Sequence, residues 1–212
     1  MLISIIDLGI NNIRSIERAI SQVKNREDEL HVVTSPNSKL YNSKLIILPG
    51  VGHFNRGTDA LDFLSLRKPL VEITETGAKI VGVCLGMQLL FQSSDEAVGK
   101  AGLGLIPGHC QRIDINRATT VPHMGWNTVN ARQNISEFNE LSKGKDFYFV
   151  HSYHAIPENK ENILAETPLR VGEFTSAVKK NNIIGFQFHP EKSGVAGRTL
   201  LGQTLKWARD EN

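Results

Sequence analysis

The sequence predicts an α/β fold with a mostly parallel central sheet flanked by helices and a strand-rich C-terminal half with mixed or antiparallel pairing. Short apolar runs alternate with amphipathic stretches over the first hundred residues, which is typical of βαβ units and a parallel sheet. After about Gly99, short strand-like runs follow one another over brief links. The chain has 212 residues, of which 40% are hydrophobic and 22% charged, so we expect residues 1–212 to form a single domain with a sizeable core.

Three strands and one helix are expected in the first fifty residues. Leu2–Ile6, His31–Thr34 and Leu45–Leu48 are apolar runs of the length of a buried strand. Asn11 and Asn12 can each cap the helix that follows the first run. The apolar residues of that helix recur at helical spacing and form its inner face: Ile13, Ile16, Ala19, Ile20 and Val23.

A second helix is expected from about Arg56 to Gly77, since glycine is a common residue just after a helix end. Its inward side chains are Leu61, Leu64 and Val71. The following stretch, 79–91, starts as an apolar strand and changes to helical spacing at Met87, Leu90 and Phe91. This change predicts a strand that turns directly into a helix.

The second half of the chain contains six strand-like runs. They are Cys110–Ile115, Trp126–Asn130, Asp146–His151, Ile163–Glu166, Gly172–Lys179 and Ile183–Phe188. The polar segment 130–144 predicts a surface loop with a little helix. A closing helix is expected from about Val195 to Ala208, with a buried stripe made of Leu200, Leu201, Thr204, Leu205 and Ala208.

Composition and charge exclude several classes of function. The formal net charge is +2 and the basic residues are scattered, which argues against a nucleic-acid partner. No apolar run approaches the roughly 20 residues that cross a bilayer, and the first residues lack the basic region of a signal peptide. Cys84 and Cys110 are the two cysteines, too few for a disulfide framework, and they fit a reducing cytoplasmic location.

Cys84 is the first candidate catalytic residue. It lies in Gly82-Val83-Cys84-Leu85-Gly86 at the predicted strand-to-helix corner, where two glycines allow the segments to cross closely. The positive end of the following helix and a nearby imidazolium would both favour the thiolate. The alternative is a small buried cysteine in an ordinary α/β protein, and we expect that packing role for Cys110.

A base for this thiol is expected at His189, in the segment Phe186–Glu191 near the C-terminus. His189 and Glu191 are two residues apart, so in an extended segment their side chains leave the same face. Glu191 could then accept from one ring nitrogen while the other nitrogen faces Cys84. The alternatives are a core histidine with satisfied hydrogen bonds and a solvated carboxylate in a turn.

Pro49-Gly50-Val51-Gly52 follows an apolar strand, and its backbone N–H groups could stabilise an oxyanion together with the amide of Leu85. In a parallel sheet, the loops after neighbouring strands meet at the carboxyl edge. The alternative is a plain strand-to-helix turn. The pattern matches neither of the glycine-rich phosphate-binding motifs.

These three motifs, in this order, resemble those of the class I (triad) glutamine amidotransferases. Three further segments resemble the glutaminase subunits of imidazole glycerol phosphate synthases within that family. They are Val121–Asn127 (Val-Pro-His-Met-Gly-Trp-Asn), Phe147–Tyr153 and His189–Ser193. The resemblance covers essentially the whole chain. The chain departs from the family pattern at Asn11, where glycine is more common, and in 55–58.

The resemblance implies that Cys84 attacks the carboxamide of glutamine, that His189 transfers the proton, and that Glu191 orients His189. It implies an oxyanion site at Val51 or Gly52 and Leu85. The residues that it assigns to glutamine binding are Gly50, Gly52, Gln88, Glu96, Ser152 and Tyr153. It implies no cofactor.

The resemblance also implies a heterodimer with a (β/α)8-barrel cyclase subunit that receives the ammonia and makes imidazole glycerol phosphate and AICAR in histidine biosynthesis. The implied interface residues are Asn12, Pro122, Met124, Trp126, Tyr148 and Lys192. Ordinary packing is the alternative for each of them. A loop at 49–52 that becomes aligned only when the partner is loaded would suppress wasteful hydrolysis of glutamine.

Three other functions stay open. A paralogous glutaminase subunit could supply ammonia for another amidation, for example of a nucleotide-linked sugar. The chain could instead be a catalytically silent regulatory subunit, or a cysteine hydrolase that acts without a partner. A metal site at His151-x-x-His154 is not expected, because no cysteine or carboxylate cluster completes it.

Overall fold

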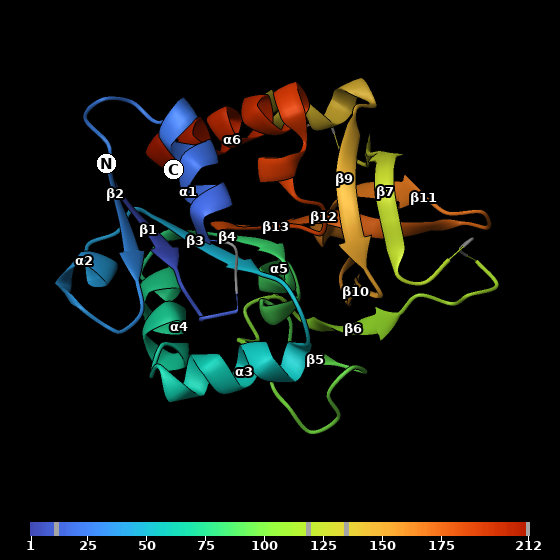
Figure 1. Ribbon diagram of the computed structural model, residues 1–212, viewed down its shortest axis with the longest axis horizontal. Coiled ribbons are helices and arrows are strands. Elements are labelled where there is room, and N and C mark those ends of the chain that lie inside the picture. Colours follow the sequence, from blue (N-terminus) through green and yellow to red (C-terminus); the bar gives the residue numbers. More distant parts are fainter. Residues whose placement is uncertain (11–12, 118–119, 134–135, 211–212) are drawn as a thin grey trace.

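The computed structural model describes residues 1–10, 13–117, 120–133 and 136–210. Its large sheet has the strand order β2-β1-β3-β4-β13-β12-β10-β6-β5, with β11 paired to β12 and β8 paired to β11 (Figure 1). These strands are β1 (Leu2–Ile6), β2 (Glu29–Val33), β3 (Leu45–Gly50), β4 (Lys79–Cys84), β5 (Ser93–Ser94), β6 (Gly108–Arg112), β8 (Asn130–Ala131), β10 (Tyr153–Pro157), β11 (Ile163–Pro168), β12 (Glu173–Lys180) and β13 (Ile183–Phe186). A separate antiparallel pair joins β7 (His123–Thr128) to β9 (Asp146–His151).

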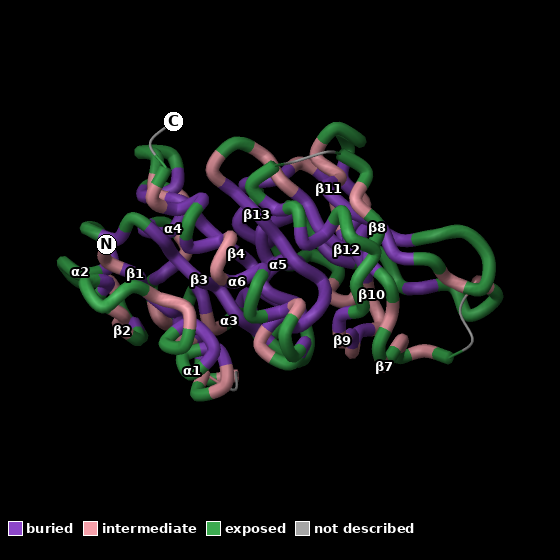
Figure 2. The backbone as a smooth tube through the Cα atoms, turned by 90° about the horizontal axis from the view of Figure 1, so that it is seen from above, coloured by how far each residue is buried: buried purple, intermediate pink, exposed green. Residues whose placement is uncertain are grey.

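The five strands β2, β1, β3, β4 and β13 are parallel, which confirms the expected sheet. Helices α1 (Ile13–Val23) and α6 (Gly194–Arg209) cover one face, and α3 (Phe54–Phe63), α4 (Arg67–Glu75) and α5 (Leu85–Leu89) cover the other (Figure 1). A single helical turn, α2 (Ser38–Tyr41), precedes β3. Every residue of β3 and β4 is buried, as strands covered on both faces require. The buried segments therefore run through the middle of the molecule in Figure 2.

The second half has the mixed pairing expected from its short runs. Strand β12 is antiparallel to β13, to β10 and to β11. The loop expected at 130–144 contains two short 3-10 turns, Ser136–Phe138 and Leu141–Lys143, after β8. Strand β10 was not predicted from sequence, since its pairing with β6 and β12 depends on contacts with distant segments.

The prediction of one helix from about Arg56 to Gly77 was wrong. The chain forms α3 and α4, and between them Ser65 has a left-handed φ of 56°. The Arg67 guanidinium donates to Asp62 and to the carbonyls of Ala101 and Gly102. These bonds fix the start of α4 in a new direction, which helical spacing in the sequence does not reveal. No helix among the residues described above is long and apolar enough to cross a membrane.

Candidate active site

Cys84 occupies the corner between β4 and α5 with φ 55° and ψ −111°, a conformation that L residues rarely adopt. The corner is held by close backbone contacts at two glycines. A Cβ on Gly86 would lie 1.7 Å from the carbonyl oxygen of Leu48, and a Cβ on Gly82 would lie 2.6 Å from the carbonyl oxygen of Gly86. The crossing expected from Gly82 and Gly86 is thus present, and it projects the thiol beyond the carboxyl end of β4.

Helix α5 is shorter than the apolar spacing predicts, because its last carbonyls pair with a neighbouring segment. The N–H groups of Leu103, Ile106 and Gly104 donate to the carbonyls of Leu89, Leu90 and Phe91, respectively. Leu90 and Phe91 are therefore buried outside the helix. A helix of this length contributes little to a macrodipole, so the expected help for the thiolate from this source is small.

The His189 and Glu191 side chains meet as expected, but through a turn. The segment Pro190–Lys192 is a 3-10 turn, which corrects the expectation of an extended link. Glu191 Oε1 lies 2.7 Å from His189 Nδ1; the His189 side chain is buried and the Glu191 side chain is 9% exposed. Because Glu191 accepts a hydrogen bond from the Nδ1–H group, Nε2 is the nitrogen that is left to exchange a proton with another group.

His189 is poised electrostatically towards Cys84. Its Nε2 is buried and has no hydrogen-bond partner among the described residues. Burial by itself lowers the pKa of His189, but the negative charge of the Cys84 thiolate and the hydrogen bond to Glu191 outweigh burial and raise this pKa to about 10. The arrangement therefore favours a protonated His189 beside Cys84.

Strand β9 holds the backbone on both sides of this histidine. The His189 N–H donates to the carbonyl of Tyr148 at 2.9 Å. The Ser193 hydroxyl donates to the His189 carbonyl at 2.6 Å and accepts from the Tyr148 N–H at 3.0 Å. Three hydrogen bonds thus fix the turn that carries the base.

Two neighbours of the thiol were not identified from sequence. The carboxamide Nε2 of Gln187 lies 3.8 Å from Cys84 Sγ, and the thiol lies 3.9 Å from the Val150 carbonyl oxygen. Gln187 was visible as part of the segment Phe186–Glu191, but its contact depends on the pairing of β13 with β4, in which Phe186 lies opposite Val83.

The thiol opens into a cavity of about 270 Å³. Its lining residues come from the loop after β3, from Cys84 and α5, from the segments after β5 and before β7, and from the β9–β10 junction: Val51, Gly52, His53, Cys84, Leu85, Gln88, Glu96, Pro122, Val150, His151, Ser152 and Tyr153. The structure thus brings together most of the residues predicted for the oxyanion and for substrate. Gly50 is buried beneath the cavity, where a Cβ would lie 2.9 Å from Leu85 Cβ.

Polar side chains of several kinds line the cavity. Glu96 is the acidic side chain among the lining residues, and its carboxylate accepts from the Phe54 N–H at 2.7 Å and lies 3.1 Å from His53 Nδ1. Burial lowers the pKa of His151 to about 3, so this ring is neutral at pH 7. Gln88 uses Nε2 for bonds within the protein, which leaves its Oε1 to accept from a ligand.

The predicted interface residues form an exposed cluster beside the cavity. Met124 and Trp126 project from β7 with 60% and 55% of their surfaces exposed. The ring centres of Trp126 and Tyr148 are 6.0 Å apart, and Lys192 Nζ lies 5.7 Å from the centre of the Tyr148 ring. Pro122 lines the cavity itself. Asn12 lies outside the described residues.

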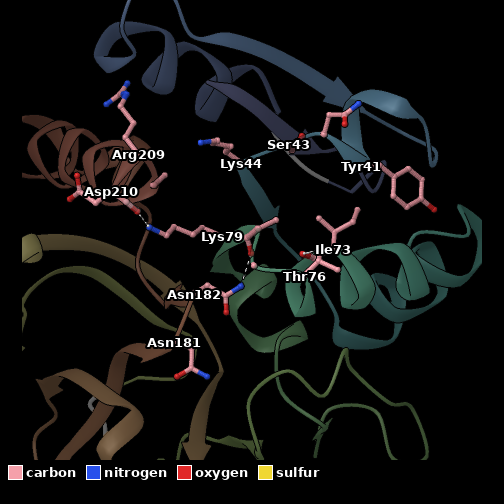
Figure 3. A pocket seen from close by; sticks show the side chains of 14 residues that line it. Tyr41, Ser43, Lys44, Ile73, Thr76, Lys79, Asn181, Asn182, Arg209 and Asp210 are labelled. Carbon is pink, nitrogen blue, oxygen red and sulfur yellow. Dashed lines mark hydrogen bonds between the residues drawn. The ribbon is translucent and has the colours of Figure 1, made fainter. Parts of the chain in front are cut away.

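A larger cavity of about 570 Å³ lies at the amino ends of β3, β4 and β13 (Figure 3). The Lys79 ammonium donates to the carbonyls of Trp207 and Asp210, each at 2.6 Å. Asn182 donates to the Thr74 and Ala78 carbonyls, near the end of α4. These groups secure helix ends, and the described residues that line this cavity include no cysteine or histidine. It is therefore a structural feature of the opposite edge of the sheet.

Comparisons with known proteins agree with this geometry. The family model "Glutamine amidotransferase class-I" matches residues 4–205. A Bacillus cereus (strain G9842) protein named "Imidazole glycerol phosphate synthase subunit HisH" is 39% identical, over 94% of this chain and 92% of its own length. A protein of the same name from Pyrococcus furiosus is 38% identical, over 94% of this chain and 95% of its own length.

Solved structures of low sequence identity share the fold. A structure described as "Crystal structure of glutamine amidotransferase" has a TM-score of 0.75 at 16% identity and covers 98% of this chain and 99% of its own. The structure of PurLQS from Thermotoga maritima has a TM-score of 0.71 at 18% identity and covers 98% of both chains.

Proposed function

The chain belongs to the class-I glutamine amidotransferase family, and from this membership we propose that it is the glutaminase subunit of an imidazole glycerol phosphate synthase. Relatives that carry that subunit name are 37–39% identical over nearly the whole chain. We further propose that residues 1–212 form one amidotransferase domain. We also propose that the protein is located in the cytoplasm, which suits its two buried free cysteines.

One observation carries the proposal for the reaction. A strained cysteine opens into a cavity, and a buried histidine beside it has one nitrogen fixed by a carboxylate and the other without a hydrogen-bond partner in the described part of the chain. This is the arrangement that a nucleophile, a base and an orienting group require.

The proposed reaction passes through a thioester on Cys84. The Cys84 thiol gives its proton to His189 Nε2, and the thiolate attacks the side-chain carbonyl carbon of glutamine, which forms a C–S bond. The oxyanion would be held by the amides of Val51 or Gly52 and Leu85. The His189 imidazolium returns its proton to the amide nitrogen as the C–N bond breaks, and ammonia leaves. Water then hydrolyses the thioester to glutamate and regenerates the thiol.

The exposed cluster supports a docked partner at the mouth of the cavity. Ammonia that escapes into neutral water is mostly protonated and no longer nucleophilic, so it must reach its acceptor along a protected route. Pro122, which lines the cavity, directly precedes β7, the strand that carries Met124 and Trp126. The Trp126 ring contacts the Tyr148 ring, and the Lys192 ammonium lies over Tyr148. A barrel-shaped cyclase subunit seated there would receive ammonia directly from the site.

The test is glutamate release from glutamine by the purified chain, alone and with a cyclase subunit of imidazole glycerol phosphate synthase loaded with its nucleotide ligand. We expect a low rate that rises strongly with the loaded partner and is lost in Cys84→Ala. A response to a different synthase would identify a paralogous glutaminase. Absence of glutamate release with every partner would overturn the proposed reaction.

A further inference from the structure

We propose that the Gln187 carboxamide donates a hydrogen bond to the Cys84 thiolate, and that Gln88 and the Tyr153 carbonyl fix its orientation. The inference deepens the proposed function, since it depends on Cys84 as the nucleophile. Gln187 is completely buried, and Gln88 has 4% of its surface exposed. Two buried carboxamides next to a nucleophile are costly to desolvate unless their hydrogen bonds are made.

The contacts form a continuous chain that ends at sulfur. Gln88 Nε2 lies 2.9 Å from the Tyr153 carbonyl oxygen and 3.1 Å from Gln187 Oε1. Gln187 Nε2 lies 3.8 Å from Cys84 Sγ, a distance suited to an N–H···S bond. Each carboxamide therefore donates one hydrogen bond to the next group in the chain of contacts.

The Tyr153 carbonyl fixes the orientation of both carboxamides. The carbonyl of Tyr153 can only accept, so Gln88 must turn its NH2 group towards it. The same NH2 group faces Gln187, so Gln187 must present Oε1 to Gln88. The NH2 group of Gln187 is then the one that faces Cys84. The reverse orientation of Gln187 would oppose two donors, so the network excludes it.

The same carbonyl is also held by a histidine pair. His151 Nδ1 donates to the Tyr153 carbonyl at 2.9 Å, and His123 Nδ1 lies 3.0 Å from His151 Nε2. Because His151 donates through Nδ1 and is neutral, its Nε2 accepts from His123. His123 of β7 therefore helps to hold the Tyr153 carbonyl in place through His151.

A donor at this position would act on the state that attacks substrate. When the thiol proton moves to His189, negative charge develops on sulfur, and an N–H aimed at sulfur gains a charge-assisted hydrogen bond. Gln187 does not itself gain or lose a proton. Loss of this bond should slow reactions of the Cys84 thiolate by about tenfold near neutral pH.

The test measures the thiol without using glutamine. Iodoacetamide forms a C–S bond with the thiolate and releases iodide, so its rate of reaction with Cys84 follows the thiolate fraction across pH. Mass spectrometry of the Cys84 peptide separates this signal from Cys110, whose thiol pKa is raised far above its ordinary value by complete burial. The variants are Gln187→Leu, which removes the donor, and Gln187→Glu, which keeps the size and accepts from Gln88.

We expect the rate of Cys84 alkylation near neutral pH to fall by about tenfold in Gln187→Leu and further in Gln187→Glu, where a carboxylate would face the thiolate. Thr204→Val is the matched control, because it removes an equally buried hydroxyl of α6, whose partner among the described residues is the Leu200 carbonyl, and it should leave the profile unchanged. An unchanged profile in both Gln187 variants would overturn the inference. If the Gln187 variants slow alkylation but no partner elicits glutamate release, the proposed function fails and this inference stands.

Discussion

Replacement of Gly86 by alanine tests the geometry of the nucleophile corner. The new Cβ would lie 1.7 Å from the Leu48 carbonyl oxygen and 2.7 Å from its carbon, whereas Cβ atoms essentially never approach within 3.0 Å. Both obstacles are backbone atoms of β3, so β3 and α5 must separate by more than 1 Å. Overpacking of this kind costs about 1–3 kcal/mol of unfolding free energy.

The same shift would misalign the reaction. Strand β3 leads into Val51 and Gly52, and a misplacement of about 1 Å in a catalytic arrangement costs about 100-fold in rate. We therefore expect Gly86→Ala to lower kcat for glutamate release by about 100-fold and to reduce stability in urea denaturation.

Gly202→Ala is the matched control for this substitution. Gly202 is also helical, but a Cβ there meets nothing within 4 Å, so alanine should stabilise the protein by about 0.4–1 kcal/mol and leave kcat unchanged. Equal stability and equal kcat in the two variants would refute the argument that close backbone contact at Gly86 sets the site.

Three further substitutions test the electrostatics. Burial lowers the pKa of His154 from 6.5 to about 4. As pH falls, the unfolded chain therefore takes up a proton at this ring before the folded chain does. The free energy of unfolding then decreases between about pH 6.5 and about pH 4, by at most about 1.4 kcal/mol per pH unit. His154→Phe should flatten this acid slope in urea titrations. In Cys84→Ser the His189 pKa should fall from about 10, as measured by NMR of the imidazole. The raised pKa stabilises the wild-type protein fully below about 6.5 and progressively less as pH rises to about 10, and Cys84→Ser should lose part of that dependence. Lys79→Met should lower the unfolding free energy by about 1–3 kcal/mol per carbonyl left unpaired, with kcat unchanged.

Each of these tests has a clear contrary result. An acid slope that is as steep in His154→Phe as in wild type would contradict the assignment to this ring. A His189 titration that is insensitive to Cys84→Ser would mean that the sulfur charge does not set its pKa. A loss of kcat in Lys79→Met at a temperature where the variant is folded would contradict a purely structural role for the larger cavity.

Local pattern predicts the parts of this molecule that depend on near neighbours in sequence. The first strand and the stripe of the closing helix follow from apolar spacing, and the corner at Cys84 follows from glycines two residues on either side. The pairing of His189 with Glu191 was also predicted, although it is made by a turn. Ser65 was not recognised as a helix break, because Arg67 bonds a segment more than thirty residues away.

The polar environment of the thiol could not be predicted in the same way. Gln187 reaches sulfur only because β13 pairs with β4 in one register. The orientation of its carboxamide depends on Gln88 and on a carbonyl of β10, a strand that the sequence does not predict. Contacts of this kind join three distant segments, and neither apolar spacing nor a motif encodes them.

Strand β9 contacts both Cys84 and His189. Its Tyr148 carbonyl accepts from the backbone of His189, and its Val150 carbonyl faces the Cys84 thiol. Residues two apart on a strand repeat at about 6.6–6.8 Å, so the pleat of a single strand sets the spacing between these two carbonyls. Insertion of one residue between 148 and 150 would turn one of the two carbonyls away from its partner. Strand β9 is therefore expected to tolerate substitutions far better than insertions or deletions.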